Sequence, residues 1–200
     1  KQIKVWCHTA QIKWSEYATG AVKRGLNNRS SWDKHWHNTM RQPVKDIDID
    51  SINWLQLPEK STLSLPLFEI PEHWLTNHPN FQKGGPEAAL AELESFFVLR
   101  GKNYASALSS PSASRDGCSR LSAYLAWGNI SLREAYQTLL SHWKKPGWKR
   151  SLVALSSRLH WHCHFIQKFE SECVMEHQHL NQGYQQFSFY QGDDAKARLQ

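Results

Sequence analysis

Long apolar stretches are missing from this sequence, and so are the glycine-rich loops that commonly bind nucleotides. No run approaches the ~18–20 apolar residues that a membrane-spanning helix requires, and no basic-then-apolar segment marks a secretory signal at the N-terminus. Neither G-x-G-x-x-G nor G-x-x-x-x-G-K-S/T occurs, and strand patterns do not alternate with helical ones. We therefore expect neither a membrane span nor a complete dinucleotide-binding α/β domain.

Cysteine and methionine are also scarce, with four and two residues among 200. The cysteines form no C-x-x-C pair and are too sparse for a disulfide framework, which favours a reducing, cytoplasmic setting; they are Cys7, Cys118, Cys163 and Cys173. The chain starts at Lys1 instead of Met. We expect it to be a processed or excised part of a longer protein.

Basic residues are abundant and unevenly placed. The chain has 24 Lys and Arg against 18 Asp and Glu, a formal charge of +6. Residues 101–169 carry ten of the basic residues against only Asp116 and Glu134, a net charge of +8. Such a concentration is typical of a surface that faces a polyanion, and a solvated basic face without a partner is the alternative.

The first 82 residues contain few signals of a compact domain. Trp32, Trp36 and Met40 recur every four residues, which indicates a helix. Five of the eight prolines fall in residues 43–82, and within this stretch residues 46–50 alternate like a single strand that has no partner. We predict a partly helical segment up to residue 42, followed by an extended connector.

From residue 83 onward the patterns are helical, so the predicted fold class is mainly α. A glycine pair before Pro86 and Glu87 starts one helix, and Ser131 with Glu134 has the spacing of a capping box. We expect helices over 86–100, 119–127, 131–143 and 148–173, loops over 102–117 and 180–195, and the start of a helix from Ala195. The apolar stripe of the longest helix is expected to be Leu152, Leu155, Leu159, Ile166 and Phe169.

A serine-rich segment, Gly117 to Leu125, is the strongest candidate for a binding site. The first N–H groups of a helix lack intrahelical partners and can bind phosphate. Ser119 and Ser122 would add two hydroxyl donors, and Arg120 would add a full charge. The alternative is an ordinary helix N-cap with a surface arginine.

The longest predicted helix carries a second candidate on a face separate from its apolar stripe. An aromatic ring next to a cation suits a flat ring or a nucleobase. A helix whose second face packs on a neighbouring domain is the alternative. The residues concerned are Arg158, Trp161, His162 and Phe165.

Histidines on the same helix raise the question of a metal site. His160 and His164 lie one turn apart and could share an ion, but the glutamate of an H-E-x-x-H motif is missing. We predict no metal.

Taken in order, these motifs resemble the C-terminal, flavin-binding half of the cryptochrome/DNA photolyase family. The family has a G-G-x-x-x-A-x-x-x-L helix, a tyrosine, the sequence Gly-Thr-Ser-Arg-Leu-Ser-Pro-Tyr-Leu, a G-x-I/L-S-x-R step and a tryptophan-bearing helix. The corresponding segments here are 84–90, Tyr104, 117–125, 128–133 and 158–161. Residues 14–42 resemble the interdomain linker of bacterial members.

The resemblance implies an architecture and a set of cofactor contacts. It implies an interdomain linker over residues 1–82, and over residues 83–200 the N-terminal part of an all-helical FAD-binding domain, truncated at its C-terminal side. It implies FAD as the cofactor of the parent protein, with contacts from Tyr104, Cys118, Ser119, Arg120, Leu121, Ser122, Arg158 and Trp161.

The implied function is that of a deoxyribodipyrimidine photolyase, a lyase that repairs pyrimidine dimers in DNA with blue light and reduced FAD. DNA would contact Arg158, Trp161, His162, Phe165, Lys149 and Arg150. We assign no catalytic residue within these 200 residues.

Departures from the family pattern leave two other functions open. Cys118 stands in place of the usual Thr, Ala123 in place of Pro, and His162 in place of Arg, while Arg158 stands where repair enzymes often have Glu or Gln. A cryptochrome photoreceptor without repair activity is one alternative, and a helical, basic nucleic-acid-binding module is the other. The family's N-terminal α/β antenna domain and the second half of its flavin domain are absent. We therefore expect this chain alone to bind little or no FAD.

Overall fold

The computed structural model describes residues 2–54, 70–76, 78–188 and 192–198. These residues contain helices and no strand, so the mainly α prediction is confirmed for them. None of their helices is long and apolar enough to cross a membrane. The α-helices are α1 (Gln2–Thr9), α2 (Trp32–Met40), α3 (Glu72–Leu75), α4 (Pro86–Val98), α5 (Tyr104–Ala107), α6 (Pro111–Gly117), α7 (Ser122–Ala126), α8 (Leu132–Ser141), α9 (Lys149–Ser171) and α10 (Asp193–Ala197). The 3₁₀ helices are η1 (Ile49–Ser51), η2 (Arg100–Asn103), η3 (Cys173–Glu176) and η4 (Gln182–Tyr184).

The chain divides into two compact units. The first unit consists of Lys1–Trp36 and His160–Gln200, and the second consists of His37–Leu159. Helices α2 and α9 each have residues in both units. The predicted boundary between a linker and a flavin domain after residue 82 stays a prediction.

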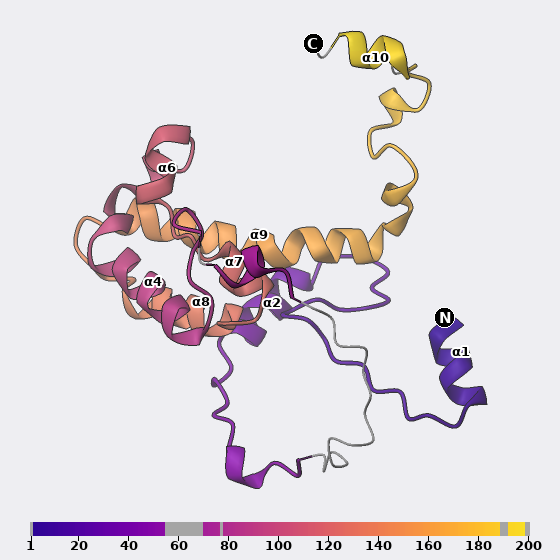
Figure 1. Ribbon diagram of the computed structural model, residues 1–200, viewed down its shortest axis with the longest axis horizontal. Helices are drawn as coiled ribbons and strands as arrows, with labels where there is room; N and C mark the ends of the chain where they lie inside the picture. The colour runs from indigo at the N-terminus through magenta and orange to yellow at the C-terminus, as the bar shows by residue number, and fades with distance from the viewer. Residues whose placement is uncertain (1, 55–69, 77, 189–191, 199–200) are drawn as a thin grey trace. The chain divides into compact units, whose positions relative to one another are not determined.

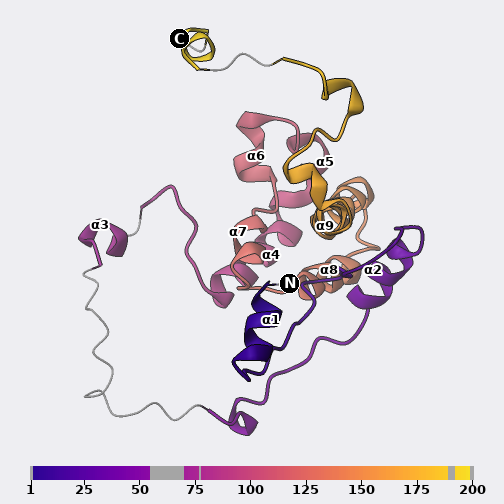
Figure 2. The same cartoon turned by 90° about the vertical axis from the view of Figure 1, so that its right-hand side faces the viewer.

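The core of the second unit is formed by aromatic and aliphatic side chains from α4, α8 and α9, which lie close together (Figure 1, Figure 2). Phe96 of α4 is fully buried and makes edge-to-face contacts with Phe97 and Tyr104, at centroid distances of 5.2 and 5.3 Å. Gly101 lies against the same ring, and a Cβ there would come within 2.5 Å of it. The close approach of backbone and ring therefore requires glycine at position 101.

Several predicted element boundaries are confirmed in the second unit. Pro86 is the first residue of α4, behind Gly85 with a φ of +102°. Ser131 and Glu134 form the complete capping box at the start of α8, with distances of 2.9 and 3.1 Å. Both starts were predicted because they depend on neighbouring residues alone.

The serine-rich stretch 102–117, predicted as a loop, is instead mostly helical. It contains the second half of η2 and the whole of α5 and α6. Ser110 caps α6 by accepting a hydrogen bond from Ala113 N–H, and Pro111 occupies the first helical position. The prediction was wrong because a Ser-Pro pair at a helix start resembles loop composition.

Two smaller predictions also need correction. The helix expected from residue 119 starts at Ser122, because Arg120 has a left-handed φ of +58° that no α-helix accommodates. The alternating residues 46–50 form no strand; η1 starts there, and Asp48 accepts a hydrogen bond from Asp50 N–H. Part of the predicted connector, 55–69 and residue 77, lies outside the described residues.

In the first unit, the segment before α2 is tied to the C-terminal half of α9 by a buried amide. Gln167 is fully buried, accepts a hydrogen bond from Lys23 N–H at 2.6 Å and donates to Lys23 C=O at 2.8 Å. Cys163 is also buried, whereas Ile166 and Phe169 are 41% and 44% exposed. The predicted apolar stripe is therefore correct at its three leucines and wrong beyond them, because a glutamine that satisfies a backbone amide can replace an apolar residue.

Candidate functional site

The candidate phosphate-binding segment, Cys118–Ser122, joins α6 to α7. Cys118 N–H donates to Ser114 C=O at 3.0 Å and so ends α6, while Leu121 is buried and directly precedes α7. Ser119 and Arg120 precede the helix, and Ser122 is its first residue. The predicted cradle at a helix N-terminus is thus a loop whose backbone changes direction at Arg120.

This segment contains an uninterrupted row of amides without acceptors among the described residues. The backbone N–H groups from Ser119 to Tyr124 donate no hydrogen bond to any described residue. Arg120 is left-handed and Leu121 is right-handed helical, an alternation that forms a concave pair of N–H donors suited to an anion. The row can therefore donate to an anionic ligand without giving up bonds within the protein.

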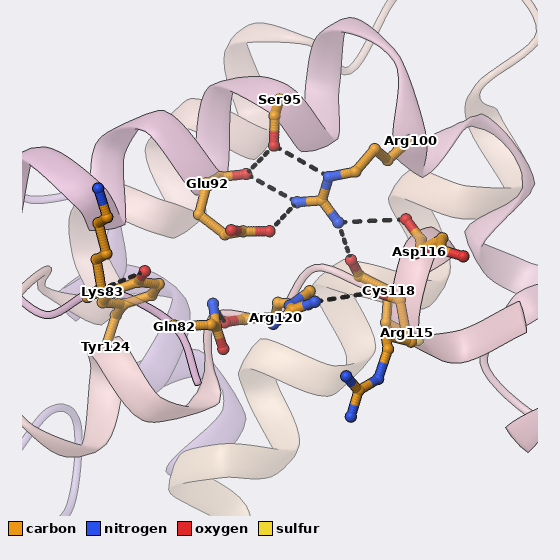
Figure 3. A network of polar contacts seen from close by, with 10 residues as sticks. All are labelled: Gln82, Lys83, Glu92, Ser95, Arg100, Arg115, Asp116, Cys118, Arg120 and Tyr124. Carbon is orange, nitrogen blue, oxygen red and sulfur yellow. Dashed lines mark hydrogen bonds and ion pairs between the residues drawn. The ribbon is translucent and has the colours of Figure 1, made fainter. Parts of the chain in front are cut away.

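Arg100 organises one end of this row (Figure 3). Its Nη1 donates to the carbonyl oxygens of Cys118 and Asp116 at 2.5 and 3.4 Å. Its Nε donates to Ser95 Oγ at 3.0 Å, and its Nη2 donates to the Glu92 carbonyl and carboxylate at 3.0 and 2.5 Å. All five guanidinium N–H donors are thus used, and Glu92 balances the charge.

A trans peptide unit points its C=O and N–H in opposite directions. Because Arg100 holds Cys118 C=O, Ser119 N–H points away from Arg100. Gln82 acts similarly, since its Nε2 donates to Arg120 C=O at 3.0 Å and turns Leu121 N–H away (Figure 3). The two side chains therefore fix the directions of two amides in the row.

Sequence reasoning did not identify Arg100, Glu92 or Gln82 as part of this site. Arg100 and Glu92 lie within or next to α4, and Gln82 precedes it, so all three are far from residues 118–122 in sequence. Their contacts arise from tertiary packing, and no local pattern in the sequence indicates them.

Cys118 and Arg158 lie near enough to Tyr104 to influence its ionisation. Burial raises the pKa of Tyr104 to about 12; Cys118 adds to the increase and Arg158 opposes it. Burial also raises the pKa of the Cys118 thiol, against the effect of Arg100. The structure thus brings together three of the residues that the sequence assigned to the cofactor, and both acidic groups are protonated at neutral pH.

The second candidate site, which consists of four residues on α9, is divided between the two units. Arg158 is an exposed residue of the second unit, while Trp161, His162 and Phe165 are exposed residues of the first. The rings of Trp161 and Phe165 meet edge to face with centroids 5.9 Å apart. Desolvation lowers the pKa of His162, so its imidazole is neutral at pH 7. The predicted separation of these residues from the buried leucines is confirmed.

His160 and His164 pack against aromatic rings. His160 lies between Trp32 and Trp36, at centroid distances of 5.1 and 4.9 Å, and its Nε2 is 3.0 Å from Asp33 Oδ1. The pKa of His164 is lowered, chiefly by burial, with smaller effects of Arg29 and other neighbouring cations. Among the described residues, no group of three or more His, Cys, Asp or Glu could hold a metal ion.

Compared with family models, curated proteins and solved structures, the chain matches none of them.

Proposed function

We propose that this chain is part of a flavin-dependent deoxyribodipyrimidine photolyase that repairs pyrimidine dimers in DNA. The observation that carries the proposal is the row of amides from Ser119 to Tyr124 that donate to no described residue. It coincides with the sequence motif that resembles the FAD phosphate-binding motif of the cryptochrome/DNA photolyase family. The helical fold of the described residues supports the proposal at a coarser level.

In this proposal the backbone amides of residues 119–122 and the hydroxyls of Ser119 and Ser122 would donate hydrogen bonds to the pyrophosphate of FAD. Arg100 keeps the amides oriented, and its own positive charge is neutralised by the Glu92 carboxylate. Arg120 supplies the adjacent positive charge. The preset directions of the amides lower the entropy cost of binding an anion there.

Tyr104 contacts the flavin as a neutral phenol, because its raised pKa keeps the proton at physiological pH. Bound FAD, when reduced and excited by blue light, would supply the electron that splits the dimer. The protein's own part is to hold the cofactor and the extruded dimer in position.

The DNA lesion is proposed to stack on the exposed edge of Trp161 and Phe165. A neutral, flat His162 fits such a stack better than a solvated cation would. Arg158 adds a charge near the lesion, while Lys149 and Arg150 contact phosphates.

Arg158 also favours a second function, that of a cryptochrome photoreceptor. Repair enzymes of the family often carry Glu or Gln at the matching position, so this residue removes an acidic or amide contact to the lesion. A repair assay on the longer protein that contains this chain separates the two functions. Dimer loss under blue light supports repair, and flavin photoreduction without dimer loss supports signalling.

The cofactor site is tested by the double substitution of Ser119→Ala and Ser122→Ala in that longer protein. Loss of two hydroxyl donors to a charged group should weaken FAD binding by about tenfold or more. The matched control is Ser109→Ala with Ser112→Ala, two exposed serines outside the site. Equal flavin retention by both double variants would refute the proposed phosphate contacts.

A further inference from the structure

Five basic side chains surround the turn between α8 and α9. Four of them follow one another closely in the sequence, and the fifth comes from η2: the Cε of Lys102 is 3.9 Å from where a Cβ on Gly147 would lie. All but Lys145 are exposed. This basic turn cluster consists of Lys102, Lys144, Lys145, Lys149 and Arg150.

Acidic side chains do not balance this charge. None of the five forms an ion pair with any described residue, and the sequence has no Asp or Glu between Glu134 and Glu170. Neighbouring like charges repel one another and destabilise the folded chain, so the cluster has an energetic cost in the absence of an anion.

Two of the lysines are held over tryptophan rings. Lys149 Nζ lies 3.9 Å from the ring centroid of Trp143, and Lys145 Nζ lies 4.0 Å from that of Trp148. Lys145 Nζ also donates to Phe97 C=O. A cation over an aromatic face loses part of its side-chain freedom but stays charged. The positive charges are therefore already arranged before a partner binds.

The backbone of the cluster is fixed as well. Ser151 Oγ donates to Lys102 C=O at 2.7 Å and accepts from Ala105 N–H at 3.3 Å, which joins η2 and α5 to the first turn of α9. Gly147 has a φ of +78°, a conformation that reverses the chain between the two helices. The five side chains thus form one surface on a rigid support.

We propose that the basic turn cluster is the docking surface for the phosphate backbone of a DNA duplex. The inference deepens the proposed function and rests on it only for the identity of the partner. A duplex carries one negative charge per ~1.7 Å of its axis, a dense array that matches several prearranged cations. An anionic membrane is the weaker match, because neither tryptophan between Trp143 and Arg150 is exposed, each ring is covered by a lysine ammonium, and the segment has no Leu, Ile, Val, Phe or Met to insert between lipids.

The test measures binding of the 200-residue chain to a fluorescein-labelled, undamaged duplex of mixed sequence, in the dark and without added flavin, over a series of KCl concentrations. The double variant Lys144→Ala with Lys149→Ala should bind roughly tenfold more weakly or worse. The slope of log affinity against log salt concentration should be less steep by about two for this variant, because each lost phosphate contact removes about 0.9 from the slope. The double variant Lys144→Arg with Lys149→Arg should bind within about twofold of the parent, because the charge is kept.

The matched control is Lys34→Ala with Lys45→Ala, which removes the same charge from two exposed lysines elsewhere. An equal loss of affinity in this control would overturn the proposal, since net charge alone would then explain binding. Binding to phosphatidylserine vesicles with no binding to the duplex would also overturn it. Flavin content of the longer protein is measured separately: cluster-dependent duplex binding without any flavin would support this surface and refute the flavin proposal alone.

Discussion

Arg100 Nη1 and the carbonyl oxygen of Cys118 are 2.5 Å apart, and this hydrogen bond aims the following amide, Ser119 N–H, away from the guanidinium. The same guanidinium is paired with Glu92 on α4. The first residue of η2 therefore fixes the backbone of a loop that begins eighteen positions later. The anion binding proposed for that loop would therefore depend on tertiary structure as well as on its own sequence.

Arg100→Gln should lower the free energy of unfolding by about 2 kcal/mol, because it leaves the half-buried Glu92 carboxylate without its cation. The variant should also speed hydrogen exchange at Cys118 N–H, which donates to Ser114 C=O, and weaken FAD binding in the longer protein. Urea unfolding and amide exchange measure the two effects. Arg115→Gln is the control, since that side chain is exposed; equal effects in both variants would contradict the role given to Arg100.

Gly101→Ala should destabilise the second unit by about 1–3 kcal/mol, because the new methyl group would press on the buried ring of Phe96. A double-mutant cycle with Phe96→Leu measures whether the ring is the cause. The two substitutions should be less harmful together than their sum, since the smaller side chain makes room for the methyl group. Additive effects in thermal or urea unfolding would rule out this contact as the reason for glycine.

Tyr104 should ionise at a pKa of about 12, above its ordinary value of 10.0. Because the folded-state pKa is raised, the buried phenol favours the folded state fully below pH 10. That stability should be lost as the pH rises from 10 to about 12, where the phenol ionises more readily in the unfolded chain. Unfolding free energies of the parent and of Tyr104→Phe, measured across this range, test the linkage. The fall should be smaller in Tyr104→Phe, and identical curves would show that Tyr104 is not responsible.

Gln167→Leu should destabilise the first unit by about 2–4 kcal/mol. The change leaves the buried N–H and C=O of Lys23 without their partners, although the leucine is similar in size and more apolar. Gln178→Leu, at an exposed position, serves as the control in urea unfolding. A neutral or stabilising effect of Gln167→Leu would mean that apolar packing at this position outweighs the two hydrogen bonds.

Local sequence signals predicted the parts of the fold that depend on neighbouring residues. The four-residue spacing of Trp32, Trp36 and Met40 predicted α2, and the Ser131/Glu134 box predicted the start of α8. Arg120 could not be predicted in the same way, because only tertiary contacts hold a non-glycine residue at positive φ.

The candidate site likewise combines residues that local sequence signals predicted with residues that only tertiary packing brings there. Its serines and Arg120 were found from the motif, whereas the start of α7 at Ser122 instead of residue 119 was not predicted. Arg100 and Gln82 act over 18 and 38 residues, a separation at which sequence periodicity carries no information. The serine content of residues 102–117 was misleading, since Ser110 caps a helix there.

The central claim is that the amide row from Ser119 to Tyr124 belongs to the FAD site of a flavoprotein. Its most direct test is the flavin content of the longer protein that contains this chain, purified in the dark and measured by absorbance before and after addition of FAD. Bound flavin is expected at close to one per chain, with a clear loss of it in the Ser119→Ala, Ser122→Ala double variant. A protein that is folded, carries no flavin and binds none when FAD is added would contradict the account.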